Sequence, residues 1–249
     1  MGGLAAAALL AAQGQDVQVI EAGLRPGGKV GVETVDGVEF DTGASVLTLS
    51  RVLELIFEEA GTSLEDELQL IEKDHLYRYI YPRGAKLDVY FSPEDTLDSI
   101  GETFGDHAAE EFDDFLRYAA GIWEAAAPNF IFDQAPSIGS MLKLGVTKLG
   151  DLRSIDPFRT MAEGIEKRIT TPELRDLLLR FATYNGSDPY SAPATLNCIA
   201  WVELGMGVYG VEGGMYEITR ALTGVAERHG AEFVYDAPVR RIRVSDGHV

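Results

Sequence analysis

The sequence predicts an α/β protein, an incomplete Rossmann-like domain with an inserted α+β, largely helical domain. Three observations support this fold class. Gly2-Gly3, an alanine-rich run over 4–12 and an apolar strand over 17–20 follow one another in the order of the second half of a βαβ unit. The region from 92 to 181 carries apolar residues at helical spacing. A further helix over 216–229 and a strand over 231–235 would return the chain to the first domain.

Composition restricts the classes of function. The 249 residues carry 40 acidic and 21 basic side chains, and this net charge of −19 argues against a nucleic-acid partner because phosphate binding needs a basic surface. The single cysteine, Cys198, excludes an intramolecular disulfide and fits a cytoplasmic location. The four histidines lack metal-ligand spacing, so we expect no metal site. No apolar stretch approaches the roughly 18–20 residues that span a bilayer.

The first 21 residues contain the helix and second strand of a dinucleotide-binding unit. The helix over 4–12 should end at Gly14, and the strand over 17–20 leads to Glu21, whose carboxylate can accept hydrogen bonds from ribose hydroxyls. Gly3 would be the third glycine of a G-x-G-x-x-G fingerprint and would let the helix pack closely on the sheet. The first two glycines and the strand before them would then lie upstream of Met1.

A glycine-rich loop and a hairpin follow this strand. In Arg25-Pro26-Gly27-Gly28-Lys29, the glycines let the backbone approach a diphosphate and the Arg25 guanidinium can pair with it. Asp36-Gly37 predicts a tight turn between strands over 32–35 and 38–40. The hairpin leads into Asp41-Thr42-Gly43.

The middle of the chain combines a hairpin with helices. We expect Ser50 to cap a helix that ends at Gly61, strands over 76–81 and 87–91, and a helix that starts at Ser92-Pro93. The aromatic residues of this hairpin either line an apolar channel or belong to the core. Prolines at 128, 136, 157 and 172 should interrupt the helical region.

Two of these motifs together resemble the FAD-dependent amine oxidase and phytoene desaturase superfamily. They are Glu21-Ala22 with Arg25 and Gly27-Gly28-Lys29, and then Phe40-Asp41-Thr42-Gly43. The resemblance implies FAD as cofactor, with Glu21 on the adenosine ribose, Arg25 and Gly28 along the diphosphate, Gly43 near the flavin ring and the backbone of Val239 on the adenine. The full set of expected cofactor residues is Gly2, Gly3, Glu21, Arg25, Gly27, Gly28, Lys29, Gly43 and Val239. It also implies an FAD-binding domain at 1–75 and 206–249 and a helical, substrate-binding cap at 76–205.

A second resemblance narrows the family. Residues 180–196 and Val211-Glu212-Gly213-Gly214-Met215 resemble the bacterial carotenoid desaturases, most closely the 1-hydroxycarotenoid 3,4-desaturase (methoxyneurosporene dehydrogenase) branch. This implies a carotenoid substrate and removal of two hydrogens from adjacent polyene carbons, with a hydride passing to FAD. The glycines at 213 and 214 either admit a flat ligand or start the next helix. The family's C-terminal glycine-rich segment is not found, so we expect a fragment that binds FAD weakly or not at all and is itself inactive.

Two alternatives stay open. One is another flavoenzyme of the superfamily with a hydrophobic substrate, such as a phytoene desaturase or a retinol saturase-like enzyme, and the other is a non-catalytic fragment that binds a polyene or lipid. No catalytic residue is identified. We interpret Asp156, Arg159 and Asp188 as turn or cap residues rather than acid–base catalysts.

Peripheral membrane association is a further expectation. The apolar segment 137–146 either enters a lipid surface or forms a buried core helix. Residues 141–180 carry eight basic and six acidic side chains, whereas the rest of the chain sums to −21. We therefore expect the protein in the cytoplasm, with peripheral attachment to the inner face of the cell membrane.

Overall fold

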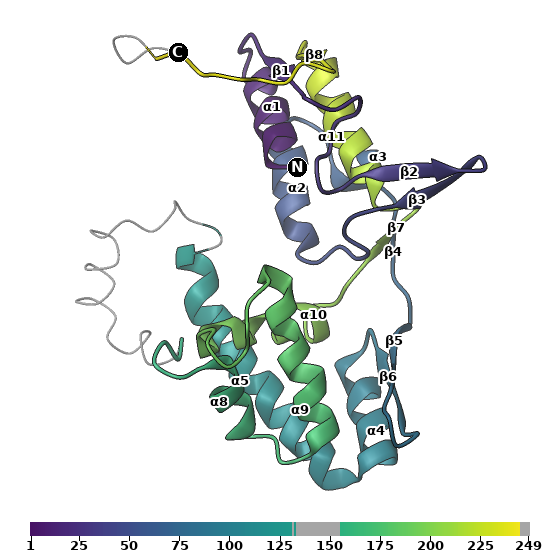
Figure 1. The fold of residues 1–249 in the computed structure, drawn as a ribbon, viewed down its shortest axis with the longest axis vertical. Helices are drawn as coiled ribbons and strands as arrows, with labels where there is room; N and C mark the ends of the chain where they lie inside the picture. Colours follow the sequence, from purple (N-terminus) through teal and green to yellow (C-terminus); the bar gives the residue numbers. More distant parts are fainter. Residues whose placement is uncertain (131, 133–154, 245–249) are drawn as a thin grey trace. The chain divides into compact units, whose positions relative to one another are not determined.

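The computed structural model describes residues 1–130, 132 and 155–244 and divides into two compact units. The first unit comprises Met1–Glu72 with Tyr209–Val249, and the second comprises Lys73–Val208. The fold is mixed helix and strand, with α1, α2 and α11 in the first unit and the longer helical array in the second (Figure 1).

The first unit is built on a close pair of helices and a parallel pair of strands. Helix α1 (Gly2–Ala12) packs on α11 (Tyr216–Arg228), and α2 (Ser50–Glu59) covers α1. The small side chains of Ala7, Ala8 and Ala11 are buried in this contact, so the helices approach closely. Strand β1 (Gln18–Ile20) pairs in parallel with β8 (Glu232–Val234), with Gln18 opposite Glu232.

Three smaller elements complete the first unit. Strands β2 (Val32–Val35) and β3 (Val38–Asp41) form an antiparallel hairpin, and the turn residues Asp36 and Gly37 have φ of 51° and 82°. Two positive φ values are typical of a type I′ turn, so the hairpin predicted from Asp36-Gly37 is confirmed. Helix α3 (Leu64–Glu67) precedes β4 (Leu70–Ile71), which pairs with β7 (Gly210–Val211).

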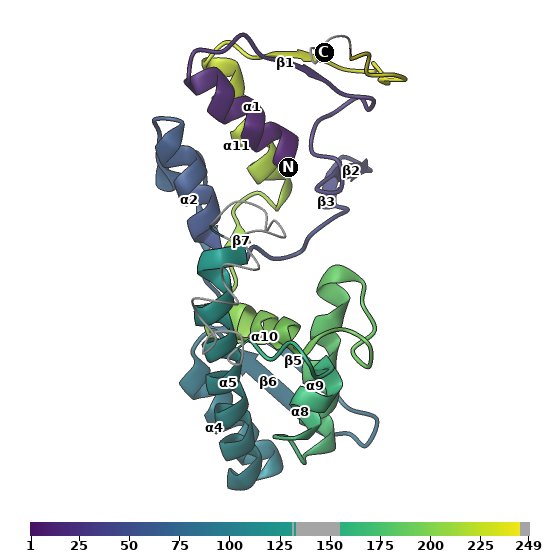
Figure 2. The same ribbon diagram turned by 90° about the vertical axis from the view of Figure 1, so that its left-hand side faces the viewer.

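The second unit packs helices against a two-stranded hairpin (Figure 2). Strands β5 (His75–Ile80) and β6 (Lys86–Tyr90) lead into α4 (Pro93–Phe104) and the long α5 (Asp106–Phe130). The remaining elements are α8 (Met161–Glu166), α9 (Pro172–Leu179), the 3-10 turns η1 (Arg180–Asn185) and η2 (Ala194–Asn197), and α10 (Cys198–Leu204). The core of this unit contains fully buried Phe112, Phe115 and Phe181.

Helix termini follow the sequence in part. The Ser92 hydroxyl accepts a hydrogen bond from the Asp95 N–H at 3.1 Å, which confirms the predicted cap. Ser50 is not a cap, because it is already helical and Leu49 occupies the N-cap position with φ 54°. The break expected at Pro128 is also wrong, since α5 continues to Phe130. Near the last turn a proline removes only one helical hydrogen bond.

The proposed lipid segment at 137–146 lies outside the described residues. Among the helices that the structure describes, none is long and apolar enough to cross a membrane.

Candidate dinucleotide site

An open pocket of about 500 Å³ lies beyond the carboxyl end of β1. Glu21 lines this pocket, and its Oε1 accepts a hydrogen bond from the Gly23 N–H at 2.7 Å. Ligands of open parallel sheets bind at the carboxyl ends of the strands, so the pocket is where a dinucleotide is expected. Its lining residues are Glu21, Gly23, Leu24, Arg25, Pro26, Gly28, Gly31, Val32, Glu33, Thr42 and Tyr216.

The backbone around the pocket is tied together by the chain after β8. The Glu21 N–H donates to the Val234 carbonyl at 2.9 Å, and the Ala237 N–H donates to the Glu21 carbonyl at 3.0 Å. The Asp236 N–H reaches the Gly23 carbonyl at 3.0 Å. These bonds extend the β1–β8 pairing and fix the backbone that carries the Glu21 carboxylate.

The two loop glycines have different roles. Gly27 is buried with φ 116°, and a Cβ there would lie 2.3 Å from the Val30 carbonyl oxygen. Gly28 has φ 60°, and a Cβ there would meet no atom within 4 Å. Gly27 therefore lets the loop fold on itself, whereas Gly28 leaves open backbone at the pocket wall.

Arg25 is the basic residue among those that line the pocket. The neighbouring Arg220 pairs with Glu39 at 2.8 Å and with Glu217, and its guanidinium lies 5.0 Å from the centre of the Tyr216 ring. Arg25 has no ion pair within the part of the chain that the structure describes. An exposed guanidinium of this kind can meet a phosphate with two parallel hydrogen bonds.

Gly43 serves packing in the structure. A Cβ at Gly43 would lie 2.0 Å from the Lys29 carbonyl oxygen and 3.0 Å from the Val30 Cα. The chain after β3 therefore crosses directly over the glycine-rich loop. Only glycine at position 43 permits this close approach, because any side chain there would collide with the loop backbone. Gly43 and Lys29 do not line the pocket, so their contact with a flavin stays a prediction.

The remaining expected cofactor residues lie apart from the pocket lining. Gly2 and Gly3 begin α1, and a Cβ at either would meet no atom within 4 Å. The close helix–sheet packing expected of Gly3 is not seen among the described residues and stays a prediction. Val239 is 58 % exposed and follows the segment that bonds to Glu21. Among the expected residues the pocket thus brings together Glu21, Arg25 and Gly28, and Gly27 belongs to the same loop without lining the pocket.

The hydrogen bonds made by Asp41 and Tyr216 were not expected from the sequence. The Asp41 carboxylate accepts hydrogen bonds from the N–H groups of Met215 at 2.7 Å and Tyr216 at 3.0 Å, so it caps α11. A Cβ at Gly214 (φ 104°) would lie 2.9 Å from Asp41 Oδ2, which explains this glycine as a helix start. The Tyr216 hydroxyl donates to the Pro26 carbonyl at 3.1 Å and closes the pocket floor. Residues so distant in sequence give no local signal of this contact.

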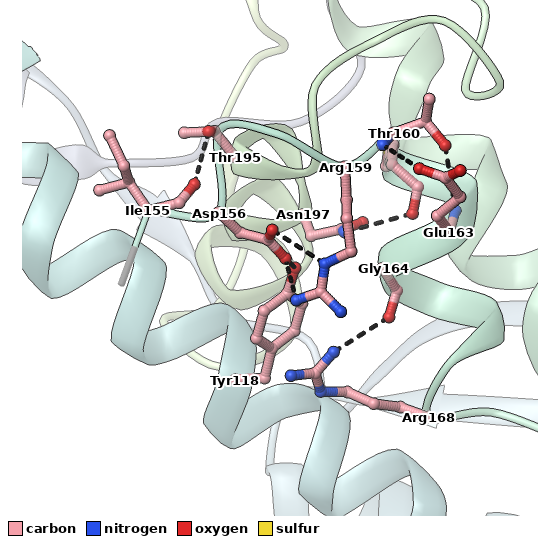
Figure 3. A network of polar contacts seen from close by, with 11 residues as sticks. Tyr118, Ile155, Asp156, Arg159, Thr160, Glu163, Gly164, Arg168, Thr195 and Asn197 are labelled. Atoms are coloured by element: carbon pink, nitrogen blue, oxygen red, sulfur yellow. Dashed lines mark hydrogen bonds and ion pairs between the residues drawn. The ribbon is translucent and has the colours of Figure 1, made fainter. Parts of the chain in front are cut away.

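The polar residues weighed for catalysis have structural partners in the second unit. Asp156 is buried with φ 49°, and it accepts hydrogen bonds from the Tyr118 hydroxyl at 2.6 Å and from Arg159 at 2.9 and 2.5 Å (Figure 3). Burial raises the pKa of Asp156, but the bonds from Arg159 and Tyr118 outweigh it and the pKa is lowered. A carboxylate held ionised in this way is poorly suited to act as a general acid or base.

The same network fixes the loop before α8. Burial raises the pKa of Tyr118 to about 12, and the Arg168 guanidinium stacks on its ring at 3.5 Å. Thr195 donates to the Ile155 carbonyl at 2.5 Å, and Thr160 caps α8 with Glu163 (Figure 3). Asp188 accepts from the Tyr190 N–H at 3.0 Å, as a turn residue does.

The fold is mixed helix and strand, and the pocket lies at the strand end where α/β proteins bind dinucleotides. The chain belongs to the flavin containing amine oxidoreductase family, whose model matches residues 1–249. A flavin is therefore its cofactor class, in agreement with the expected FAD.

The chain is similar to several curated proteins over almost its whole length. The chain is 36 % identical to proteins named hydroxyneurosporene desaturase from Rubrivivax gelatinosus, over 99 % of this chain and 47 % of that protein, and from Rhodobacter capsulatus, over 100 % and 50 %. It is 33 % identical to a protein named 4,4'-diapolycopene oxygenase from Methylomonas sp, over 99 % and 49 %. The chain spans about half the length of these curated relatives.

Solved structures support the fold alone. An oxidoreductase from Methanosarcina mazei matches with a TM-score of 0.61 at 17 % identity, over 99 % of this chain and 52 % of that chain. Putrescine oxidase bound to putrescine matches with 0.57 at 20 %, over 96 % and 49 %. A RAB GDI from Plasmodium falciparum matches with 0.53 at 13 %, over 98 % and 57 %, so the fold is shared by proteins with different names and roles.

Proposed function

We propose that this chain belongs to an FAD-dependent oxidoreductase that desaturates a carotenoid by removing two hydrogens from adjacent polyene carbons. The observation that carries the proposal is 36 % identity over nearly the whole chain to two hydroxyneurosporene desaturases. The pocket at the end of β1 supports it, because its residues suit the cofactor that such a reaction needs.

The described residues fit the adenosine diphosphate part of FAD. Glu21 keeps one carboxylate oxygen, Oε2, without a hydrogen bond in the described chain, and this oxygen can accept from a ribose hydroxyl. Gly28 and Arg25 offer open backbone and a cation for the diphosphate. We also assign Gly2, Gly3, Gly27 and Lys29 to the cofactor site, with Gly43 near the flavin ring and the backbone of Val239 on the adenine.

In this proposal the first unit binds the cofactor and the second unit binds the substrate. When bound, FAD supplies the hydride acceptor. The first unit orients the cofactor through Glu21 and Arg25, and the largely helical second unit, inserted between the two parts of the first, binds the substrate. A polyene has little polar surface, so apolar burial must supply most of its binding energy and exclude water from the reacting carbons.

We also propose that the protein works in the cytoplasm, attached peripherally to a membrane, because a substrate of this kind dissolves in lipid. Flotation of the protein with anionic liposomes tests this. Recovery of the protein only at the bottom of the gradient would contradict it.

The function is tested by expressing the complete reading frame that contains this sequence in cells that accumulate neurosporene, hydroxyneurosporene or phytoene. A desaturase yields a product that has lost two hydrogens and absorbs at longer wavelength. Glu21→Ala should lose that product and bind FAD about 10- to 100-fold more weakly, since it removes hydrogen bonds to a charged acceptor. Asp16→Ala, an exposed acid outside the pocket, is the matched control.

Each alternative gives a different result in the same experiment. Conversion of phytoene alone would identify a phytoene desaturase, and a product that gains oxygen would match the relative named 4,4'-diapolycopene oxygenase. A polyene that copurifies unchanged without flavin would mean a non-catalytic binding protein. The oxygenated product and the unchanged polyene would each contradict the proposed desaturation, whereas conversion of phytoene alone would keep the desaturation and change the assigned substrate.

A further inference from the structure

A polar cluster lies among aromatic rings in the second unit. We call it the Arg180 cluster, and it consists of Arg180 and Tyr184 from η1, Glu203 from α10, and Tyr77 and Tyr79 from β5. The Glu203 side chain is 1 % exposed. Its Oε1 accepts from Arg180 Nη2 at 2.5 Å, and its Oε2 accepts from the Tyr184 hydroxyl.

The charges of the cluster are already balanced. The Arg180 guanidinium compensates the buried Glu203 carboxylate, so the pair is neutral as a whole. Burial raises the pKa of Tyr77, Tyr79 and Tyr184, and the three hydroxyls therefore stay protonated. A charged ligand would upset this balance, whereas a neutral one would not.

One donor in the cluster lacks an acceptor. Arg180 Nε is buried and has no hydrogen-bond partner in the described part of the chain. An unpaired buried N–H is unfavourable, and native structures usually supply an acceptor from protein, water or ligand. Around it lie the rings of Phe181, Tyr77 and Tyr79, whose centres are 4.5, 5.6 and 5.8 Å from the guanidinium carbon.

The cluster is also open to the outside of its unit. The Arg180 side chain is 33 % exposed, and Tyr184 is 44 % exposed. The Tyr184 hydroxyl donates its hydrogen to Glu203, which leaves its oxygen lone pairs able to accept. The unpaired Nε donor of Arg180 is itself buried, but it and the Tyr184 acceptor belong to side chains that reach the surface of the unit.

We propose that the Arg180 cluster is a specificity site that recognises a hydroxyl group on an otherwise apolar polyene, an inference that rests on the proposed function. A hydroxyl both accepts and donates, so it can pair with Arg180 Nε, directly or through a water, and with the Tyr184 oxygen. The surrounding rings bury the hydrocarbon next to that group. A hydrocarbon polyene would leave the donor unpaired and bind less well.

The test compares two probes, an acyclic carotene and its hydroxylated derivative with the same conjugated length. Their affinities for the purified full chain are measured in detergent by quenching of protein fluorescence. The unchanged protein should bind the hydroxylated probe about 3- to 10-fold more tightly, the range of one or two neutral hydrogen bonds. Arg180→Lys keeps the positive charge beside Glu203 but removes the Nε–H, and it should lose this ratio while still binding the carotene.

Tyr184→Phe is the second variant and should also reduce the ratio, which keeps the test decisive if Arg180→Lys does not fold. Tyr190→Phe, at an exposed tyrosine of the same unit, should leave the ratio unchanged. Equal affinity of the unchanged protein for both probes would overturn this inference and leave the proposed function standing. A ratio that survives in both variants would overturn it too. Failure to bind either probe would overturn both the inference and the carotenoid substrate.

Discussion

Replacing Gly43 by alanine isolates the contact between the strand end after β3 and the glycine-rich loop. Gly43 does not have a positive φ, so alanine suits its backbone and the whole cost is steric. The new Cβ would lie 2.0 Å from the Lys29 carbonyl oxygen, and the obstructing atom belongs to backbone rather than to a flexible side chain. The loop that carries Gly28 must therefore move by more than an ångström.

We expect Gly43→Ala to destabilise the first unit by about 3 kcal/mol, the upper part of the range for overpacked sites. Gly28→Ala is the matched control, because its φ of 60° is strained for alanine but its Cβ would meet no atom within 4 Å. That control should cost only about 1 kcal/mol.

Hydrogen exchange of the amides in α1 and α11 is the appropriate assay. Both tryptophans, Trp123 and Trp201, lie in the second unit, so intrinsic tryptophan fluorescence would not report on the first. The exchange rates give the free energy of opening of the first unit in each variant. If Gly43→Ala costs no more than Gly28→Ala, the steric reasoning is refuted.

Two further substitutions test contacts between distant segments. Asp41→Ala removes the two hydrogen bonds to the start of α11 and should cost about 1–2 kcal/mol, measured by the same exchange assay. Glu65→Ala, at an exposed residue of α3, is the control, whereas Asp36→Ala would add strain because Asp36 has a φ of 51°. Glu111→Gln should destabilise the second unit by about 2 kcal/mol in urea unfolding at neutral pH, because the buried Glu111 carboxylate accepts four hydrogen bonds from Thr170 and Thr171. Burial raises the pKa of Glu111, but these bonds outweigh it and the pKa lies below its ordinary value of 4.5. The stabilisation is therefore present above pH 4.5 and is lost as the pH falls through the lowered pKa, so a difference between the two proteins that does not shrink in acid would contradict this assignment.

The sequence predicted local features better than distant ones. Asp36-Gly37 and Ser92-Pro93 determine a turn and a helix start through bonds within four residues, and both were predicted correctly. Ser50 was misassigned because the left-handed conformation of Leu49 moves the helix start, and nothing in the adjacent residues indicates that conformation.

In the candidate site, too, contacts within one short segment were predictable from the sequence and contacts between distant segments were not. Glu21, Arg25 and Gly28 follow a strand in a recognisable order, so their place at one pocket could be inferred. The capping of α11 by Asp41 and the contact of Gly43 with Lys29 depend on how the folded backbone returns on itself. The Arg180 cluster likewise joins β5, η1 and α10, which only the tertiary structure brings together.

The pairing of β1 with β8 has a consequence for the newly made chain. Residue 18 emerges from the ribosome long before its partner, residue 232, and the whole second unit is synthesised in the interval. During that time the apolar face of α1, with Leu4, Ala7 and Ala11, has no α11 to cover it. The second unit is one continuous segment and has its own core, so translation delivers this whole segment before β1 can pair with β8.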